Sequence, residues 1–191
     1  MKKILTLLAI SSLATLNIYA SEVEHSEMHE EQKSDFYVAV KAIATLGDSI
    51  EEEHATLEGD VGKGIGIDLG YKLSHGFSVE VDATYVTNTV TEKPLHGESE
   101  DFSASYITTS LDIAYKYPLT HTVGLVAKCG YEYEIEKIDD LDIDNSETGF
   151  VAAVAVEYEV SEHMALLGEY EYTTIEGPRG DSVFAGVVYS F

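Results

Sequence analysis

Hydrophobic and polar residues alternate along most of this chain from Asp35 onward. The period of the alternation is two, so each stretch places apolar side chains on one face and polar or small side chains on the other, as a β-strand does. Eight stretches follow the pattern, and they cover residues 36–45, 63–73, 77–85, 103–117, 122–135, 149–160, 164–173 and 183–191. The pattern therefore predicts an all-β fold.

The lengths of these stretches and of their connections favour a barrel that crosses a membrane. Most stretches have roughly ten residues, which is the length that a tilted strand needs to cross a bilayer core. The connections after the second, fourth and sixth stretches are about three or four residues long, whereas the others run from about eight to seventeen. We therefore predict an eight-stranded antiparallel up-and-down transmembrane β-barrel over residues 35–191.

Aromatic residues on the apolar face gather at both ends of the predicted strands. At the short-turn end they are Phe36, Tyr71, Phe77, Tyr115, Tyr117, Tyr158, Tyr189 and Phe191. At the long-loop end they are Tyr85, Tyr131, Tyr133, Phe150, Tyr170 and Tyr172. Such rings prefer the headgroup level of a bilayer, so two aromatic belts indicate that the apolar face points outward into lipid.

The opposite face carries charges that cannot face lipid, where each would cost about 2–4 kcal/mol near the midplane. We therefore predict a charge network inside the barrel. Its members are Lys41, Asp68, Lys72, Glu80, Asp82, Asp112, Lys116, Lys128, Glu132, Glu157 and Glu169. An eight-stranded interior is just wide enough for side chains to fill, which favours a polar plug. The excess of acids over lysines keeps open the alternative of a narrow cation-preferring pore.

The start of the chain predicts export. Residues 1–20 have a basic beginning at Lys2 and Lys3, an apolar run and a small residue at Ala20, as a signal peptide does. Residues 21–34 are acidic without apolar periodicity, so we expect a disordered segment. The formal net charge of −24 argues against binding to nucleic acid, which requires neutralisation of phosphates.

The predicted long loops are acidic, and one of them suggests a divalent cation site. Its candidate ligands are Asp140, Asp142, Asp144 and Glu147. The spacing resembles a calcium loop, but Asn145 and Val151 stand where an EF-hand needs glycine and glutamate. Two interpretations remain open, namely a solvated acidic loop and a loose site through which divalent cations bridge to anionic lipopolysaccharide.

Catalytic motifs have little support in this sequence. His75, His121 and His163 fall in predicted short turns, and neither His54 nor His96 has a serine and an acid beside it in a recognisable arrangement. Cys129 is the only cysteine, so no intramolecular disulfide can form. We therefore expect a protein that is not an enzyme and has no cofactor.

The end of the chain resembles the carboxyl-terminal assembly signal of bacterial outer-membrane β-barrels. Gly186, Tyr189 and Phe191 match that signal, although Phe184 stands where the family favours a polar residue. Residues 127–131 (AKCGY) and 168–172 (GEYEY) look like recurring strand segments of the same proteins. The chain over residues 35–191 is thus similar to the OmpA/OmpX-like family of small eight-stranded outer-membrane β-barrels, with no periplasmic domain after the barrel.

The resemblance implies a bacterial outer-membrane protein that contacts lipid and lipopolysaccharide and meets the assembly machinery through its last strand. We expect a monomer. Three functions stay open at this point. They are a non-enzymatic surface or envelope protein with a structural or adhesive role, a narrow cation-preferring pore, and a soluble lipocalin-like binding barrel with the two faces reversed.

Overall fold

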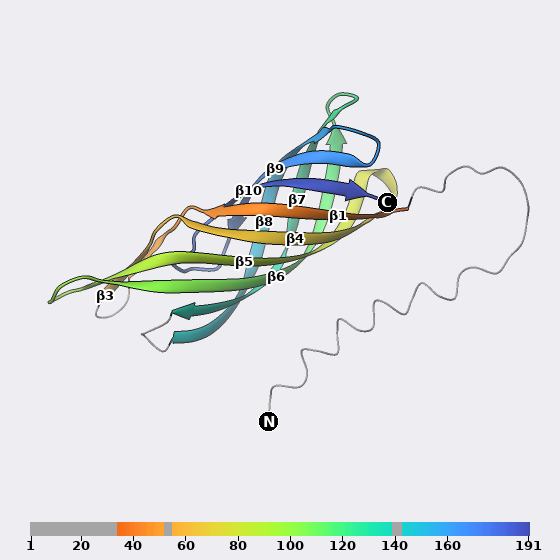
Figure 1. Ribbon diagram of the computed structural model, residues 1–191. Helices are drawn as coiled ribbons and strands as arrows, with labels where there is room; N and C mark the ends of the chain where they lie inside the picture. The colour runs from red at the N-terminus through yellow and green to blue at the C-terminus, as the bar shows by residue number, and fades with distance from the viewer. Residues whose placement is uncertain (1–33, 52–54, 139–142) are drawn as a thin grey trace, which may run out of the picture. The chain divides into compact units, whose positions relative to one another are not determined.

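A computed structural model describes residues 34–51, 55–138 and 143–191 (Figure 1). The predicted signal peptide and residues 21–33 lie outside the described residues. The strands are β1 Phe36–Thr45, β2 Ser49–Glu51, β3 Ala55–Gly59, β4 Gly62–Lys72, β5 Phe77–Pro94, β6 Glu100–Pro118, β7 Val123–Ile138, β8 Ile143–Glu159, β9 Met164–Thr173 and β10 Ser182–Ser190. A 3₁₀ turn at Ser74–Gly76 joins β4 to β5.

Eight of these strands close into a barrel. The order around the barrel is β1, β4, β5, β6, β7, β8, β9 and β10, and every neighbouring pair is antiparallel. The first and last strands complete the ring, because β1 pairs with β10 from Tyr37 opposite Ser190 to Thr45 opposite Ser182. The predicted eight-stranded antiparallel barrel is therefore confirmed.

The two faces of the barrel wall differ as the alternation predicts. In β1, Val40 is 60% exposed on the outside, whereas its neighbour Lys41 is 2% exposed on the inside. The outward face of β4 carries the exposed residues Ile65, Ile67 and Leu69. All fourteen residues of the two predicted aromatic belts are exposed, and they are the ones named above. An outer face of this kind suits lipid, and a soluble binding barrel would need the opposite arrangement.

The strands on one side of the barrel are longer than the alternation pattern suggested. β5 has 18 residues and β6 has 19, whereas β1 and β9 have 10 each. Residues 86–94 continue β5 because the β-branched alternation of Val86, Thr87, Thr89 and Val90 suits a strand. β2 and β3 also form within residues 46–61, where the alternation predicts no strand, and β3 extends the sheet beside β5.

The barrel interior is layered and not polar throughout. Small and medium apolar residues pack inside its short-turn half, and they are Ala39, Ala114, Val126, Ala155, Ala165, Leu167 and Val188. A second apolar core fills the long-loop half with Ile43, Leu57, Val86, Val90, Ala104, Tyr106, Ile138 and Phe184. The buried charged side chains lie next to these two apolar layers and next to the loop of residues 174–181.

The loop of residues 174–181, which joins β9 to β10, reaches into the long-loop end, and we call it the cap loop. Three hydrogen bonds join it to the residues that follow β1: Leu46 N donates to Asp181 O at 2.8 Å, Gly47 N to Arg179 O at 3.1 Å and Asp48 N to Pro178 O at 3.3 Å. The side chain of Asn88 in β5 also donates to Pro178 O at 3.2 Å. Pro178 and Arg179 are consequently buried at this end of the barrel.

Candidate functional site

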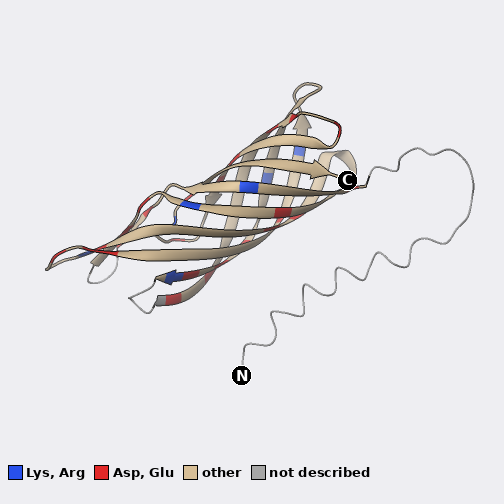
Figure 2. Cartoon of the chain, viewed as in Figure 1, with Lys and Arg blue, Asp and Glu red and all other residues tan. Residues whose placement is uncertain are grey.

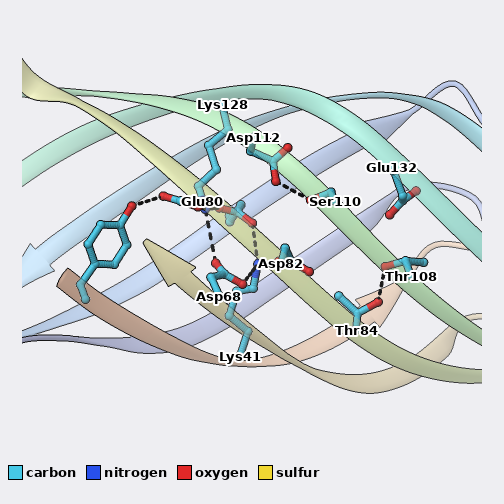
Figure 3. Close-up of polar contacts among 12 residues, drawn as sticks. Lys41, Asp68, Glu80, Asp82, Thr84, Thr108, Ser110, Asp112, Lys128 and Glu132 are labelled. Carbon is cyan, nitrogen blue, oxygen red and sulfur yellow. Dashed lines mark hydrogen bonds and ion pairs between the residues drawn. The ribbon is translucent and has the colours of Figure 1, made fainter. Parts of the chain in front are cut away.

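Six charged residues meet inside the barrel, and we call them the central network; all of them except Glu169 are labelled in Figure 3. They are Lys41, Asp68, Glu80, Asp82, Lys128 and Glu169. They come from β1, β4, β5, β7 and β9, so their contacts cross the lumen and do not merely follow one wall.

Lys41 is the first of the two cations of the network. Its Nζ atom lies 2.9 Å from Asp68 Oδ1 and 2.6 Å from Asp82 Oδ2. It also lies 3.3 Å from Glu169 Oε1 and 4.3 Å from the centre of the Phe184 ring. Three carboxylates and an aromatic face surround this ammonium group, which compensates for the loss of its hydration.

Lys128 binds the network from the far side of the lumen. Its Nζ atom lies 2.6 Å from Glu80 Oε2, 2.8 Å from Glu169 Oε2 and 3.5 Å from Asp68 Oδ2. Glu169 and Asp68 therefore bridge the two lysines. A buried charge pair of this kind is strongly destabilised when one partner is removed, because the other charge stays buried without compensation.

Tyr37 is hydrogen-bonded to the central network on the side of the short-turn end. Its hydroxyl donates to Glu80 and also lies 3.0 Å from Ser78 Oγ. The Tyr37 ring lies against Gly70 of β4, where a Cβ atom would come within 2.0 Å of the ring. The Tyr37 ring can therefore occupy this position only because residue 70 is a glycine without a side chain.

Arg179 of the cap loop supplies a third buried cation. Its Nη2 atom lies 2.6 Å from Glu132 Oε1 and its Nε atom 2.7 Å from Glu134 Oε2. Burial lowers the pKa of this guanidinium group, but the carboxylates of Glu132 and Glu134 outweigh burial and hold its pKa above the ordinary value. The positive charge is permanent, so the side chain fastens the cap loop to β7.

A second group of charges lies at the short-turn end, where a cavity of ≈ 570 Å³ opens. Lys116 Nζ lies 2.7 Å from Glu157 Oε2 and 3.0 Å from Glu159 Oε1. Lys72 Nζ lies in the same cavity and donates to Ser190 Oγ at 2.8 Å. These side chains are partly exposed and are separate from the central network.

The predicted interior residues therefore divide into several sets. Lys41, Asp68, Glu80, Asp82, Lys128 and Glu169 come together at the centre, while Lys72, Lys116 and Glu157 line the short-turn cavity. Glu132 pairs with Arg179. Asp112 is buried and accepts a hydrogen bond from Ser110 of its own strand.

The predicted divalent cation loop is only partly described. Asp140 and Asp142 lie outside the described residues. Asp144 Oδ2 lies 3.8 Å from Lys137 Nζ, and Glu147 Oε1 accepts a hydrogen bond from Asn145 Nδ2 at 3.1 Å. Within residues 34–51, 55–138 and 143–191, no three side chains of His, Cys, Asp or Glu are grouped so that they could hold a metal ion.

Two features of the interior were not anticipated from the sequence. The alternation does not place Arg179 inside the barrel, because this residue lies between Pro178 and Gly180 in a predicted loop. Arg179 is the only arginine of the chain, and this was the sequence signal that could have indicated a role inside the barrel. The apolar core was missed because Val86, Val90 and Tyr106 lie beyond or on the polar side of the predicted strands, where polar side chains were expected.

The residues of the predicted assembly signal lie at the seam between the first and last strands. Gly186 faces Lys41 in the ladder, and a Cβ atom there would come within 2.6 Å of Val40 O. The rings of Tyr189 and Phe191 contact each other edge to face on the outside, with their centres 5.1 Å apart. Phe191 N donates to Phe36 O at 3.1 Å, so the end of the chain is fastened to β1.

Comparisons with known proteins agree with this architecture. The model of the outer membrane protein beta-barrel domain family matches residues 4–191. No curated protein sequence matches the chain. No helix among the described residues is long and apolar enough to span a membrane.

Solved structures of small outer-membrane barrels share the fold at low sequence identity. OprG of Pseudomonas aeruginosa superposes with a TM-score of 0.67 at 14% identity, over 83% of this chain and 97% of that one. Neisserial surface protein A superposes with a TM-score of 0.59 at 20% identity, over 84% and 100%. Ail of Yersinia pestis, in complex with the heparin analogue sucrose octasulfate, gives 0.53 at 12% identity, over 83% and 98%.

The membrane-facing exterior, the closed ring of eight strands and the family match agree with one another. The short turns then lie on the periplasmic side and the long loops on the extracellular side, as in other barrels of this kind. The chain belongs to the outer membrane protein beta-barrel domain family and lies in the bacterial outer membrane.

Proposed function

We propose that this chain is a non-enzymatic surface protein of the outer membrane, whose barrel is a closed anchor and whose extracellular sheet makes the functional contacts. The observation that carries the proposal is the filled interior. The central network, the Arg179 pairs and the apolar core follow one another along the lumen. Side chains that fill the lumen in this way support an anchor without a continuous aqueous path.

The extracellular sheet supports the second half of the proposal. A strand of about 9–11 residues suffices to cross the bilayer, so the 18 and 19 residues of β5 and β6 leave several residues outside it. At about 3.3 Å per residue, this excess projects on the order of 20 Å beyond the membrane. The β5–β6 hairpin carries Glu92, Glu98, Glu100 and Asp101, and the ribbon of this hairpin bears the colour of acidic residues (Figure 2).

The charge of this surface points to cationic partners. The solved structure of Ail holds a polyanionic heparin analogue, which an acidic surface would repel. Contact with anionic lipopolysaccharide would need divalent cations as bridges, with Asp144 and Glu147 as two of the acids available near the β7–β8 tip. The same proposal includes a monomeric protein whose last strand is recognised by the outer-membrane assembly machinery.

A narrow cation-preferring pore is the second candidate. The observation in its favour is the cavity of ≈ 570 Å³ at the periplasmic end, which reaches Glu80 of the central network. Acids along a lumen favour cations over anions. This function requires that the network and the cap loop move aside.

Single-channel recording in planar bilayers separates the two functions. We expect no conductance steps from the purified full chain, with a wide porin in the same lipid as the positive control. Steps that carry potassium in preference to chloride would contradict the closed anchor and establish the pore.

A further inference from the structure

A cleft with a volume of ≈ 760 Å³ lies at the extracellular end of the barrel, beside the seam between β1 and β10. One wall is formed by residues 46–51, which include β2. The other wall is formed by residues 172–176 at the end of β9 and the start of the cap loop, together with Gly180 and Asp181. We call it the edge cleft.

The lining of the edge cleft combines acidic and apolar side chains. The acids are Asp48, Glu51, Glu176 and Asp181, and the large apolar or aromatic residues are Leu46, Ile50, Tyr172 and Ile175. None of the described residues that line the cleft is basic. Leu46 is 50% exposed, so apolar surface is available next to the carboxylates.

Two of the four carboxylates are already bound within the protein. Asp181 accepts a hydrogen bond from the Tyr170 hydroxyl, and Asp48 Oδ1 accepts one from Ser49 N at 2.7 Å. The carboxylates of Glu51 and Glu176 are exposed, and neither has an ion pair or hydrogen bond with another described residue. These two groups are therefore available to a cation from outside.

β2 adds unpaired backbone groups to the same cleft. It is an edge strand that pairs only with β3 within the described chain. Gly59 N donates to Asp48 O at 2.8 Å, so the alternation of an antiparallel ladder makes Ile50 opposite Leu57 the next hydrogen-bonded pair. The peptide groups of Glu51 consequently point away from β3 along the open edge. An edge of this kind can pair with another extended chain.

We propose that the edge cleft binds an extended peptide segment in which basic side chains alternate with apolar ones. The peptide backbone adds to the edge of β2, the basic side chains reach Glu51 and Glu176, and the apolar ones cover Leu46. The inference rests on the proposed surface function and names the partner class for one site on that surface. A second copy of this acidic chain would be repelled from the cleft.

A binding titration with the full chain, folded in lipid nanodiscs, tests the proposal. The probe is a short fluorescein-labelled peptide of alternating lysine and valine, and the readout is fluorescence anisotropy at moderate salt. We expect saturable binding that the double variant Glu51→Gln/Glu176→Gln weakens at least tenfold. The matched control is Asp35→Asn/Glu162→Gln, which removes the same charge from exposed positions at the short-turn end and leaves affinity unchanged.

A second comparison separates backbone pairing from charge attraction. The same peptide with alternate N-methylated amides keeps its charge but loses donors for the edge of β2, so we expect it to bind at least tenfold more weakly. Spermine should not compete at equal charge concentration. Equal binding of the methylated peptide, full competition by spermine, or equal losses in both double variants would overturn the proposal.

A failure of the peptide-binding proposal can be distinguished from a failure of the proposed closed-anchor function. Conductance by the natural chain would contradict the closed anchor, yet peptide binding and its loss in Glu51→Gln/Glu176→Gln would still support the cleft. A chain that neither conducts nor binds the lysine–valine peptide would retain the closed anchor and remove this partner. Each variant is checked by its electrophoretic shift on boiling, so a misfolded variant is recognised.

Discussion

At the scale of single residues, Lys41 holds the interior together. It contacts Asp68, Asp82 and Glu169, which belong to three other strands. Such buried pairs are costly to desolvate and even more costly to break. The interior of this barrel therefore depends on the complete set of charges more than on any single attraction.

Replacing Lys41 by alanine should destabilise the protein by about 3–5 kcal/mol, because three buried carboxylates lose their shared cation. The measurement is urea unfolding in lipid vesicles followed by circular dichroism, since the chain has no tryptophan. Lys93→Ala is the control, because Lys93 pairs with Glu58 on the exposed hairpin surface. Its loss should cost about 0–1 kcal/mol. Similar losses in the two variants would contradict a buried network.

Gly70→Ala should also destabilise the barrel, by about 1–3 kcal/mol, because the added methyl group collides with the Tyr37 ring. Gly168→Ala in β9 is a matched control, since a Cβ atom at this outward position meets nothing within 4 Å. Thermal unfolding in the same detergent compares the two. A Gly70 variant as stable as the Gly168 variant would show that the ring is free to move aside.

At the scale of secondary-structure elements, the cap loop is the part whose position depends most on contacts with residues that are distant in the sequence. Arg179 joins it to β7, while the backbone of residues 178–181 joins it to the residues that follow β1. Gly47 and Gly180 permit this contact, since both have positive φ angles of 71° and 66°, and a Cβ atom on Gly180 would come within 2.7 Å of Gly47 O. The cap loop therefore stays in place over the long-loop end of the barrel as long as Arg179 is paired with Glu132 and Glu134.

Arg179→Gln should loosen the cap loop, because Glu132 and Glu134 lose their cation and the loop loses its anchor on β7. We expect faster amide hydrogen exchange at Gly47 and Asp48, which donate to Arg179 O and Pro178 O. Lys137→Gln is the control, since its pair with Asp144 is exposed and 3.8 Å long. Unchanged exchange at the two amides would mean that backbone contacts alone hold the loop.

The projecting hairpins are the second element that matters. β7 and β8 stay paired up to Ile138 opposite Ile143, beyond the point where β8 loses its pairing with β9 at Val151. The wall is therefore high over β5 to β8 and low over β9, β10 and β1 (Figure 1). The edge cleft lies at the low side, where loops and not strands define the surface.

At the scale of the whole molecule, closure of the ring makes the barrel a cooperative unit. Every strand of the ring has two neighbours, so no edge remains within the membrane-spanning part. A closed barrel should resist detergent until it is heated. We expect the full chain in outer-membrane fractions to migrate differently before and after boiling, and the shift to occur at a lower temperature in Lys41→Ala.

The control for this prediction is Gly168→Ala, which should keep the transition temperature of the natural chain. A single band at one position, boiled or unboiled, would contradict a stable closed barrel. The electrophoretic test reports on closure alone and is independent of conductance or peptide binding.

Much of the fold was predictable because its cause is local. Alternation with a period of two assigns each side chain to lipid or lumen without knowledge of partners, so Val40 and Lys41 could be placed on opposite faces. The extra length of β5 was missed because Val86 and Val90 are apolar on the inward face, which breaks the polar pattern expected there. β2 and β3 were missed because they are short and depend on β5 for pairing.

The amino-acid sequence by itself determined the number of barrel strands, the two faces of the wall and the belts of aromatic rings, since each follows from neighbouring residues and the thickness of a bilayer. Only the tertiary structure decided which charges meet. Lys41 and Glu169 are separated by 128 positions, and Arg179 comes from a loop with no periodic pattern. Such contacts depend on strand register and on where a loop folds, which local alternation does not specify.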